Sequence, residues 1–388
     1  MTKPIALIAG GGIAGTVAAL ALSRAGWAPQ VFEARTEGAD DQGAWLTVAV
    51  NGLNALRVLG LDPADVLAAG FGTPSLTMFN GGGRQLARLP LGATTTTIKR
   101  ADLYAALRRA AVERGIPIAY AKGLRDFTEG PNGVTVTFAD GTTASGDLLV
   151  GADGIRSRTR EALDPGGPTP SYLGLLNAGG FTDGPVDAVV DRTPGMVHMA
   201  FGRRAFFGWT TAPDGSVWWF ANPPSKQPVR PGDFTAESWR SHLIELFEDD
   251  ALPAAAIIRA PGQVLGPWNT DDLPRAPVWR SRRAVLIGDA AHAVAPSSGQ
   301  GASMAFEDAV TLGLCLDGRR DPADGLADYE RRRRGRVERI VAVGRRNGSG
   351  KAAGPIGAAV RDAMFPLVTK LLYRKGDPQA WILDHRVA

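Results

Sequence analysis

Three glycines near the start of the chain have a spacing that suits dinucleotide binding. Gly10, Gly12 and Gly15 follow the short apolar run Ile5–Ala9 and overlap the start of the alanine- and leucine-rich segment Ile13–Arg24. The run is typical of a strand buried on both faces, and the segment predicts a helix. Glycines at such a turn let backbone N–H groups approach a pyrophosphate, and the helix start adds partial positive charge.

Glu33 lies eighteen residues beyond Gly15, at the end of a second predicted strand, residues 31–33. There its carboxylate would accept the hydroxyls of an adenosine ribose, and its charge disfavours a 2′-phosphate. A glycine-rich turn in an ordinary α/β protein is the alternative. We favour the dinucleotide site because strand, glycines, helix and acid occur in the required order.

A second carboxylate follows a strand in the middle of the chain. Residues 124–129 and 134–138 predict a hairpin, and a predicted strand at 147–150 leads to Asp153 and Gly154. An Asp-Gly pair alone is among the commonest turns in proteins, so by itself it favours an ordinary turn.

A third segment is more specific. Residues 284–287 predict a buried strand, which is followed by Gly288 and Asp289. Asp289 is placed to bind hydroxyl groups. The glycine-bracketed loop 299–301 opens the predicted helix Gly301–Leu316 and directs N–H groups toward an electron-rich ligand.

A β-rich segment interrupts this nucleotide-type pattern. Residues 171–280 hold six of the nine tryptophans and seven of the fourteen phenylalanines. The runs Met196–Phe201, 205–211 and 216–222 predict antiparallel strands. The predicted fold class is therefore α/β (α+β), with a Rossmann-like domain interrupted by a β-sheet-rich domain and followed by C-terminal helices.

The expected boundaries are 1–170, including some strands of the second domain near 73–98, then 171–280, 281–347 and a C-terminal helix and tail at 348–388. We also expect a helix at 102–114 capped by Asp102, and a long surface helix at 328–346. A flexible joint at 348–357 and a helix at 358–372, kinked at Pro366, complete the prediction.

Composition excludes several broad classes. The 388 residues are 44% hydrophobic and 21% charged, and mean hydropathy is −0.06. These values fit a soluble globular protein, not a disordered, collagen-like or polytopic membrane chain. The uncharged stretch 5–22 could pass for a signal peptide, but three consecutive glycines argue against it. Cys315 is the single cysteine, so no intramolecular disulfide can form and we expect a cytoplasmic protein.

The net charge of +4 is concentrated in residues 319–346, which hold ten arginines and five acids. The arginine run 331–334, with Glu330 and Glu338 nearby, is typical of a solvated helix face, so we expect no nucleic-acid binding. The four scattered histidines have no zinc-like spacing, and no metal site is expected.

Together, the glycine turn with Glu33, the Asp153 turn and the Asp289 loop resemble the flavin-dependent aromatic hydroxylases, the p-hydroxybenzoate hydroxylase-like (class A) monooxygenases. The resemblance reaches to about Asn347, and the size is similar to the shorter tetracycline-degrading, salicylate-type and urate-type members. It implies an FAD cofactor, NADPH or NADH as a transient electron donor, and O2. It also implies a flavin C4a-hydroperoxide that transfers oxygen in a dry pocket.

The resemblance also implies which residues hold FAD. Glu33 matches the ribose ligand, Arg100 an arginine that reaches the flavin or its pyrophosphate, and Asp289 the ligand of the ribityl chain. The amides of Gly301 and Ala302 would stabilise negative charge around N1 and the C2 carbonyl of reduced flavin. The full expected set is Gly10, Gly12, Ile13, Ala14, Gly15, Glu33, Ala34, Arg35, Arg100, Leu124, Asp153, Gly288, Asp289, Pro296, Gly299, Gly301 and Ala302.

The aromatic segment is expected to form the lid and walls of the substrate pocket. Candidate substrate contacts are Trp45, Thr47, His198, Phe207, Trp209, Trp219 and Pro296. For each aromatic residue, filling the core of a sheet is the alternative. We expect His198 to be hydrogen-bonded beside a strand, His292 to hold its loop and Cys315 to be packed, and we assign no catalytic side chain.

The chain departs from the family's pattern around residues 43–51. It has Val50-Asn51 where the family often has a Pro-Asn pair, and Asp40-Asp41 where an arginine is frequent near the flavin. The contacts to the nicotinamide donor therefore stay open.

We predict an FAD-dependent, NAD(P)H-consuming monooxygenase that hydroxylates or epoxidises an aromatic or polycyclic small molecule. A flavin oxidase, halogenase or reductase on the same scaffold, a non-catalytic nucleotide-binding protein and an NAD-dependent dehydrogenase are alternatives. The lack of a second glycine fingerprint disfavours a two-fingerprint reductase, and the lack of a Trp-x-Trp-x-Ile-Pro stretch disfavours a halogenase. No membrane insertion is expected.

Overall fold

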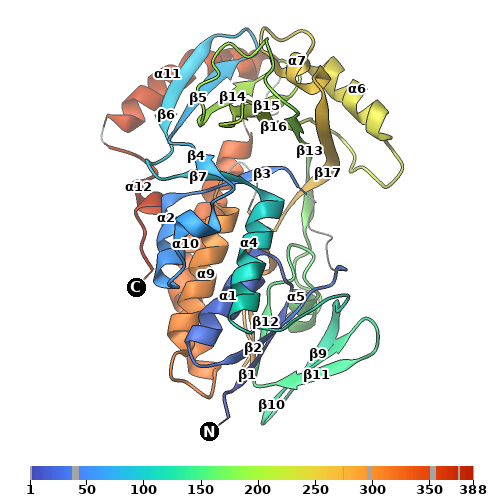
Figure 1. Ribbon diagram of the computed structural model, residues 1–388, viewed down its shortest axis with the longest axis vertical. Helices are drawn as coiled ribbons and strands as arrows, with labels where there is room; N and C mark the ends of the chain where they lie inside the picture. The colour runs from blue at the N-terminus through green and yellow to red at the C-terminus, as the bar shows by residue number, and fades with distance from the viewer. Residues whose placement is uncertain are drawn as a thin grey trace.

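Two sheets form the two ends of the molecule (Figure 1). The computed structural model describes residues 2–36, 43–273, 275–294, 299–349, 355–374 and 376–387. A parallel sheet with its helices lies at the end that carries the N-terminus. A large, mainly antiparallel sheet lies at the other end.

The parallel sheet brings distant parts of the chain together. Its strands lie in the order β18 (Ala284–Leu286), β12 (Leu148–Gly151), β1 (Ile5–Ala9), β2 (Ala28–Phe32) and β8 (Ile118–Ala119). All neighbouring strands are parallel. Their carboxyl ends therefore meet at one edge, which is where ligands bind in open α/β sheets.

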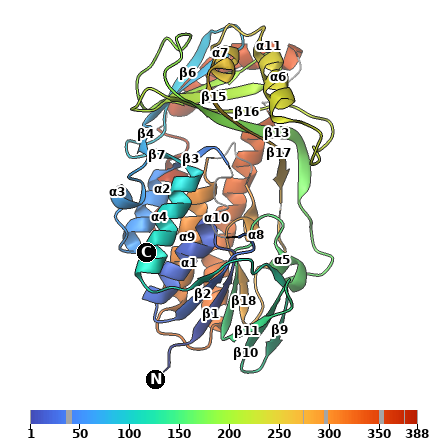
Figure 2. The same cartoon turned by 45° about the vertical axis from the view of Figure 1, so that its right-hand side comes forward.

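Alternate residues of β1 bury opposite faces of this sheet. Ala6 and Ile8 pack toward α1 (Ile13–Arg24) and α9 (Gly301–Leu316), while Leu7 and Ala9 pack toward a small three-stranded sheet. Its strands are β9 (Leu124–Gly130), β10 (Gly133–Phe138) and β11 (Thr143–Gly146). Figure 2 shows these two layers on either side of the parallel strands. Both faces are covered, which explains the continuous apolar runs.

The second sheet has seven strands from four separate stretches of chain. Their order is β17 (Gly262–Asp272), β13 (Ser171–Thr182), β16 (Val217–Asn222), β15 (Phe206–Thr211), β14 (Met196–Phe201), β5 (Ser75–Asn80) and β6 (Gln85–Pro90). β14 and β5 are parallel, and the other neighbours are antiparallel.

The two faces of this seven-stranded sheet contact different elements. One face packs against α6 (Ala236–Phe247) and α7 (Ala254–Arg259). The other face looks toward a small sheet ordered β3 (Trp45–Val48), β7 (Thr96–Lys99) and β4 (Phe71–Gly72). α11 (Pro355–Tyr373) packs against β6 on the outside of the molecule (Figure 1).

The remaining helices connect these layers. They are α2 (Val50–Val58), α3 (Pro63–Val66), α4 (Arg100–Glu113), α5 (Arg158–Leu163), α8 (Asp289–His292), α10 (Ala323–Ser349) and α12 (Ala380–Leu383). Within the described residues, no helix is long and apolar enough to cross a membrane.

Several predicted boundaries need correction. α4 begins at Arg100 and Lys99 is its N-cap, so Asp102 lies inside the first turn. Part of the expected joint at 348–357 is helical, because α10 extends to Ser349 and α11 begins at Pro355. The centre of that joint lies outside the described residues.

Candidate functional site

The first glycine turn is shaped by close contact at two positions. Gly10 has a φ of +103°, and a Cβ there would collide with the carbonyl of Ala152. A Cβ on Gly15 would collide with the Gly10 carbonyl. These two glycines therefore let α1 begin directly against the ends of β1 and β12.

Gly12 is different, because a Cβ built on it would meet nothing within 4 Å. Gly12 is the N-cap of α1 and no side chain caps the helix. The space beside it thus faces the positive end of a helix, which suits an anionic group.

Glu33 ties this turn to the end of β2. Its Oε2 accepts a hydrogen bond from the Gly11 N–H at 2.7 Å, and its Oε1 accepts one from the Arg35 N–H at 2.9 Å. A carboxylate has further acceptor capacity at both oxygens. Glu33 can therefore hold the loop and still accept a ribose hydroxyl.

Asp289 lies at the same sheet edge, at the start of α8. Its side chain is exposed to solvent, yet the surrounding protein raises the pKa of its carboxyl, with His292 and Arg100 partly offsetting this. We call the surroundings of Asp289 and of Arg100, whose charge acts on it, the recess. Gly288 supports this placement, since a Cβ there would lie 2.8 Å from the Ala14 Cβ.

Arg100 reaches the recess from a different element. It opens α4, and its backbone N–H donates to the Ala44 carbonyl at 3.1 Å. Its Nε donates to the Tyr104 hydroxyl at 2.9 Å, and its charge acts on Asp289. The structure thus brings an arginine and an aspartate from distant segments to one recess.

The other predicted cofactor residues lie around the same edge. Ile13 and Ala14 form the first turn of α1, Ala34 and Arg35 follow β2, Leu124 begins β9, and Gly301 and Ala302 open α9 behind Gly299. A Cβ on Gly123 would lie 3.4 Å from the Ala34 Cβ, which places the start of β9 beside Ala34. Pro296 lies outside the described residues.

The carboxylate of Asp153 stabilises the turn that it belongs to by accepting hydrogen bonds. Its Oδ1 accepts a hydrogen bond from the Ser157 hydroxyl at 2.5 Å, and its Oδ2 accepts from the N–H and hydroxyl of Thr159 at 2.9 and 3.0 Å. These bonds fix the entry to α5.

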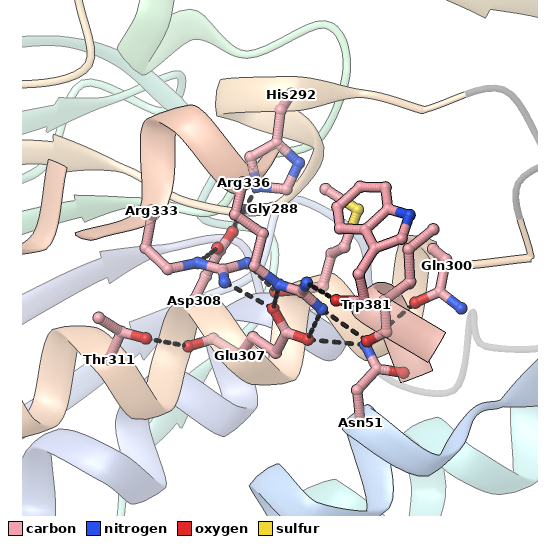
Figure 3. Close-up of polar contacts among 12 residues, drawn as sticks. Asn51, Gly288, His292, Gln300, Glu307, Asp308, Thr311, Arg333, Arg336 and Trp381 are labelled. Carbon is pink, nitrogen blue, oxygen red and sulfur yellow. Dashed lines mark hydrogen bonds and ion pairs between the residues drawn. The ribbon is translucent and has the colours of Figure 1, made fainter. Parts of the chain in front are cut away.

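A buried charge network holds α9 in place (Figure 3). Arg333 of α10 donates from Nη1 to Glu307 Oε2 at 2.5 Å and from Nε to Asp308 Oδ1 at 2.7 Å. Arg336 donates to both carboxylate oxygens of Glu307 and to the backbone carbonyls of Trp381 and Ile382. The network therefore joins α9, α10 and the C-terminal α12.

The same network reaches the two loops at the sheet edge. Asp308 Oδ2 accepts from the Gly288 N–H at 2.9 Å and hydrogen-bonds His292 Nε2 at 2.5 Å. The Nδ2 of Asn51 donates to Gln300 at 3.0 Å, just before α9 begins, and to Glu307 at 2.7 Å. His292 holds its loop, as predicted.

The arginine run was predicted to be solvated, and for Arg333 this is wrong. Arg333 is only 1% exposed. Arg334 lies over the Trp279 ring at 4.9 Å, while Arg331 does remain at the surface with Asp328. The reason for the difference is that Glu307 and Asp308 are themselves buried and require a cation.

Trp45 and Thr47 belong to β3 of the small sheet, and Trp45 contacts the seven-stranded sheet. The Trp45 ring meets Phe220 edge-on at 5.4 Å. A Cβ on Gly299 would lie 3.9 Å from the Thr47 hydroxyl, so Thr47 adjoins the loop before α9. These contacts place Trp45, Thr47 and Phe220 of β16 near the loop before α9, and we call this set the pocket face.

Lys99 was not among the residues predicted from the sequence, and it lies next to Trp45 of the pocket face. It pairs with Trp45 across β3 and β7. Its Nζ lies 4.7 Å from the Phe181 ring and 5.3 Å from the Trp218 ring. Within the described chain its ammonium has no hydrogen-bond partner, so it can bind an acceptor atom of a ligand.

His198, Phe207, Trp209 and Trp219 lie on the other face of the sheet, so their placement does not support a substrate contact. Phe207 stacks on Trp219 at 5.7 Å and meets Phe247 of α6 at 5.1 Å. The alternation along β16 was visible in the sequence, since Trp218 and Phe220 must oppose Trp219. The sequence does not say which side of β16 is covered by α6 and α7; in the structure these helices cover the Trp219 side.

His198 also differs from the expectation of a hydrogen-bonded histidine. It is buried, and neither ring nitrogen has a hydrogen bond in the described structure. Its Nε2 lies 3.7 Å from Asp191, and its ring stacks on Trp209 at 4.9 Å. Burial lowers the pKa of His198, and Asp191 partly offsets this effect.

The residues at the sheet edge fit an FAD molecule. The open space at Gly12 suits a pyrophosphate, the acceptor Glu33 suits a ribose, and Asp289 with Arg100 nearby suits a polyol. A family model described as an FAD binding domain matches residues 4–343. The chain belongs to the class A flavin-dependent monooxygenases. FAD is thereby confirmed as the cofactor of this family member.

Curated relatives of this monooxygenase family cover nearly the whole chain. An aurachin C monooxygenase/isomerase from Stigmatella aurantiaca is 35% identical over 355 residues, which span 87% of this chain and 86% of the relative. A 2-heptyl-3-hydroxy-4(1H)-quinolone synthase from Mycobacteroides abscessus is 31% identical, covering 87% and 88% of the two chains. An FAD-dependent urate hydroxylase from Klebsiella pneumoniae is 31% identical, covering 88% of each chain.

Solved monooxygenase structures share the fold. Klebsiella pneumoniae HpxO, complexed with FAD and uric acid, superimposes with a TM-score of 0.82 at 24% identity, covering 98% of this chain and 95% of that one. A salicylate hydroxylase substrate complex superimposes with a TM-score of 0.79 at 22% identity, covering 99% and 96%. The predicted fold class is confirmed.

Proposed function

We propose that this monooxygenase uses NADPH or NADH and O2 to add one oxygen atom to an electron-rich aromatic or polycyclic small molecule in the cytoplasm. The relatives named for aurachin C, a heptyl quinolone and urate support an aromatic substrate. Residues 1–170 and 281–347 would form the FAD-binding domain and 171–280 the substrate domain, with β5 and β6 added to its sheet.

The glycine turn would hold the dinucleotide half of FAD. The space beside Gly12 would take the pyrophosphate, because the first amides of α1 point there without a capping side chain. Glu33 would accept the ribose hydroxyls through its remaining lone pairs. Ile13, Ala14, Gly15, Ala34, Arg35, Leu124 and Asp153 would complete this part of the site.

The recess would hold the flavin half. Asp289 would accept hydroxyls of the ribityl chain, and Arg100 would neutralise the phosphate charge nearby. The amides of Gly301 and Ala302, at the start of α9, would stabilise negative charge on the ring. When bound, FAD supplies electron transfer from the nicotinamide donor and activation of O2.

The pocket face would orient the substrate and exclude water. Trp45, Trp218 and Phe220 supply aromatic surface, and Lys99 supplies a positive charge among their rings. An ammonium at this place would bind a phenolate, enolate or carbonyl oxygen and set which carbon of the ring faces the cofactor.

The observation that carries this proposal is that Asp289 and Arg100, from distant segments, come together beside the glycine turn, where a Cβ on Gly288 would touch Ala14 of α1. The experiment is an oxygen-labelling assay of the FAD-loaded protein with NADPH or NADH, using 2-alkyl-4-quinolones, phenols and purines. Substrate-stimulated coenzyme consumption with one labelled oxygen in the product supports the proposal. Stoichiometric peroxide without labelled product would indicate an oxidase, and would overturn it.

A further inference from the structure

α11 turns its most apolar side toward solvent. Six of the ten exposed large apolar side chains of the described chain belong to this one helix. Leu371 is 65% exposed and Leu367 is 64% exposed, whereas leucine side chains are usually buried. The six residues are Val360, Met364, Leu367, Val368, Leu371 and Leu372.

Their spacing makes one continuous stripe. Positions 360, 364, 367, 368, 371 and 372 recur at intervals of three and four residues, so they share one face of the helix. The face toward the protein is instead partly polar, with Arg361, Asp362 and Thr369 half-buried. A stripe of this size on one helix marks an interaction surface.

The charges beside the stripe are positive. Asp362 is the only acid of α11; it pairs with Arg361 at 2.7 Å and accepts a hydrogen bond from Asn80 at 2.9 Å. Lys370 and Arg374 are exposed, and neither has an ion-pair partner among the described residues. Asp377 is the acid whose charge reaches Tyr373 at this end of the stripe, so Lys370 and Arg374 leave an excess of positive charge there.

We propose that α11 docks the enzyme on a membrane surface that contains anionic lipids. The stripe would enter the boundary between headgroups and acyl chains, while Lys370 and Arg374 would bind lipid phosphates. The helix is not apolar enough to span a bilayer, so it would lie in the plane of the surface. A second copy of the chain would cover the apolar stripe but would leave Lys370 and Arg374 without anionic partners, whereas an anionic lipid surface provides for both the stripe and the cations.

The inner side of the helix leads to the pocket. Phe365 lies 6.0 Å from Phe201, and both belong to the apolar cluster that contains Trp45, Met199 and Phe220. A lipophilic substrate would thus find apolar surface on both sides of α11. The inference about a lipophilic substrate rests on the proposed function, whereas the docking of α11 on a membrane does not.

Vesicle co-sedimentation of the FAD-loaded full chain tests the docking. We expect binding to phosphatidylcholine vesicles that contain phosphatidylglycerol, and a loss of about tenfold or more in the double variant L367E/L371E. Replacing Lys370 and Arg374 by Gln should weaken binding to anionic vesicles about fivefold per charge and leave binding to pure phosphatidylcholine unchanged.

Val112→Glu is the matched control, because Val112 is 62% exposed on α4 and lies outside the stripe. It should sediment like the unchanged protein, and retained flavin absorbance reports folding of every variant. Failure of the unchanged protein to bind anionic vesicles overturns the proposal. So does a stable dimer, seen by light scattering, that L367E/L371E dissociates. Neither result depends on catalytic activity, so the proposed function is tested separately.

Discussion

At the scale of a residue, Lys99 is the side chain that most directly reports how substrate binds. We predict that Lys99→Met raises KM about tenfold or more, since a hydrogen bond to a charged group contributes about 1.5–3 kcal/mol. FAD affinity should not change, because the Lys99 ammonium lies over Phe181 and Trp218 and not at the glycine turn. Steady-state kinetics and flavin titration measure the two effects.

Lys99→Arg is the control for this prediction, because it keeps the positive charge at the same place. It should restore most of the lost affinity for an oxyanionic substrate. An unchanged KM in Lys99→Met would show that substrate binds away from β7, and the assignment of this pocket face would be wrong.

At the scale of an element, the position of α9 depends on its buried ion pairs with α10. We predict that Arg333→Met lowers the free energy of unfolding by about 3–5 kcal/mol, because Glu307 and Asp308 would each lose a buried partner. Urea denaturation of the FAD-loaded protein measures this. Arg331→Met, which removes an exposed pair with Asp328, should cost less than about 1 kcal/mol. Equal effects of the two substitutions would contradict the account.

The same network predicts an acid sensitivity. Burial alone would raise the pKa of Asp308, but His292 and Arg333 lower it from 3.8 to about 2. A depressed pKa in the folded state gives stability that is present above pH 3.8 and is lost as pH falls toward about 2. We expect the unfolding free energy to fall over this window, with a smaller slope in Asp308→Asn. Identical slopes in the two proteins would contradict the network.

At the scale of the whole molecule, much of the cofactor edge could be predicted from sequence. β1, α1 and α9 have the predicted bounds because their apolar runs and glycine ends are local signals. The runs that form β1, β12 and β18 were each predicted as strands, whereas their order in the parallel sheet was not predicted.

The remainder depends on contacts between distant residues. Arg333 looked solvated because its partner Asp308 lies 25 positions away, on a different helix. In the same way, Trp218 and Trp219 are neighbours with opposite surroundings, and only the packing of α6 and α7 decides which ring faces the pocket. Local patterns define elements, whereas tertiary contacts assign their faces.

We propose that FAD lies with its pyrophosphate beside Gly12, and a single substitution there is the sharpest test of this placement. Gly12→Val should fold, because its φ of −74° is ordinary and a Cβ there meets nothing within 4 Å. Its side chain would occupy the space of the pyrophosphate. Gly184→Val is the matched control, since a Cβ at Gly184 also meets nothing within 4 Å.

The measurement is the dissociation constant of FAD from the refolded apoprotein, followed by flavin fluorescence. We expect Gly12→Val to bind FAD at least about tenfold more weakly with an unchanged apoprotein melting temperature, and Gly184→Val to bind FAD normally. A Gly12→Val protein that retains FAD with the original affinity would contradict the account.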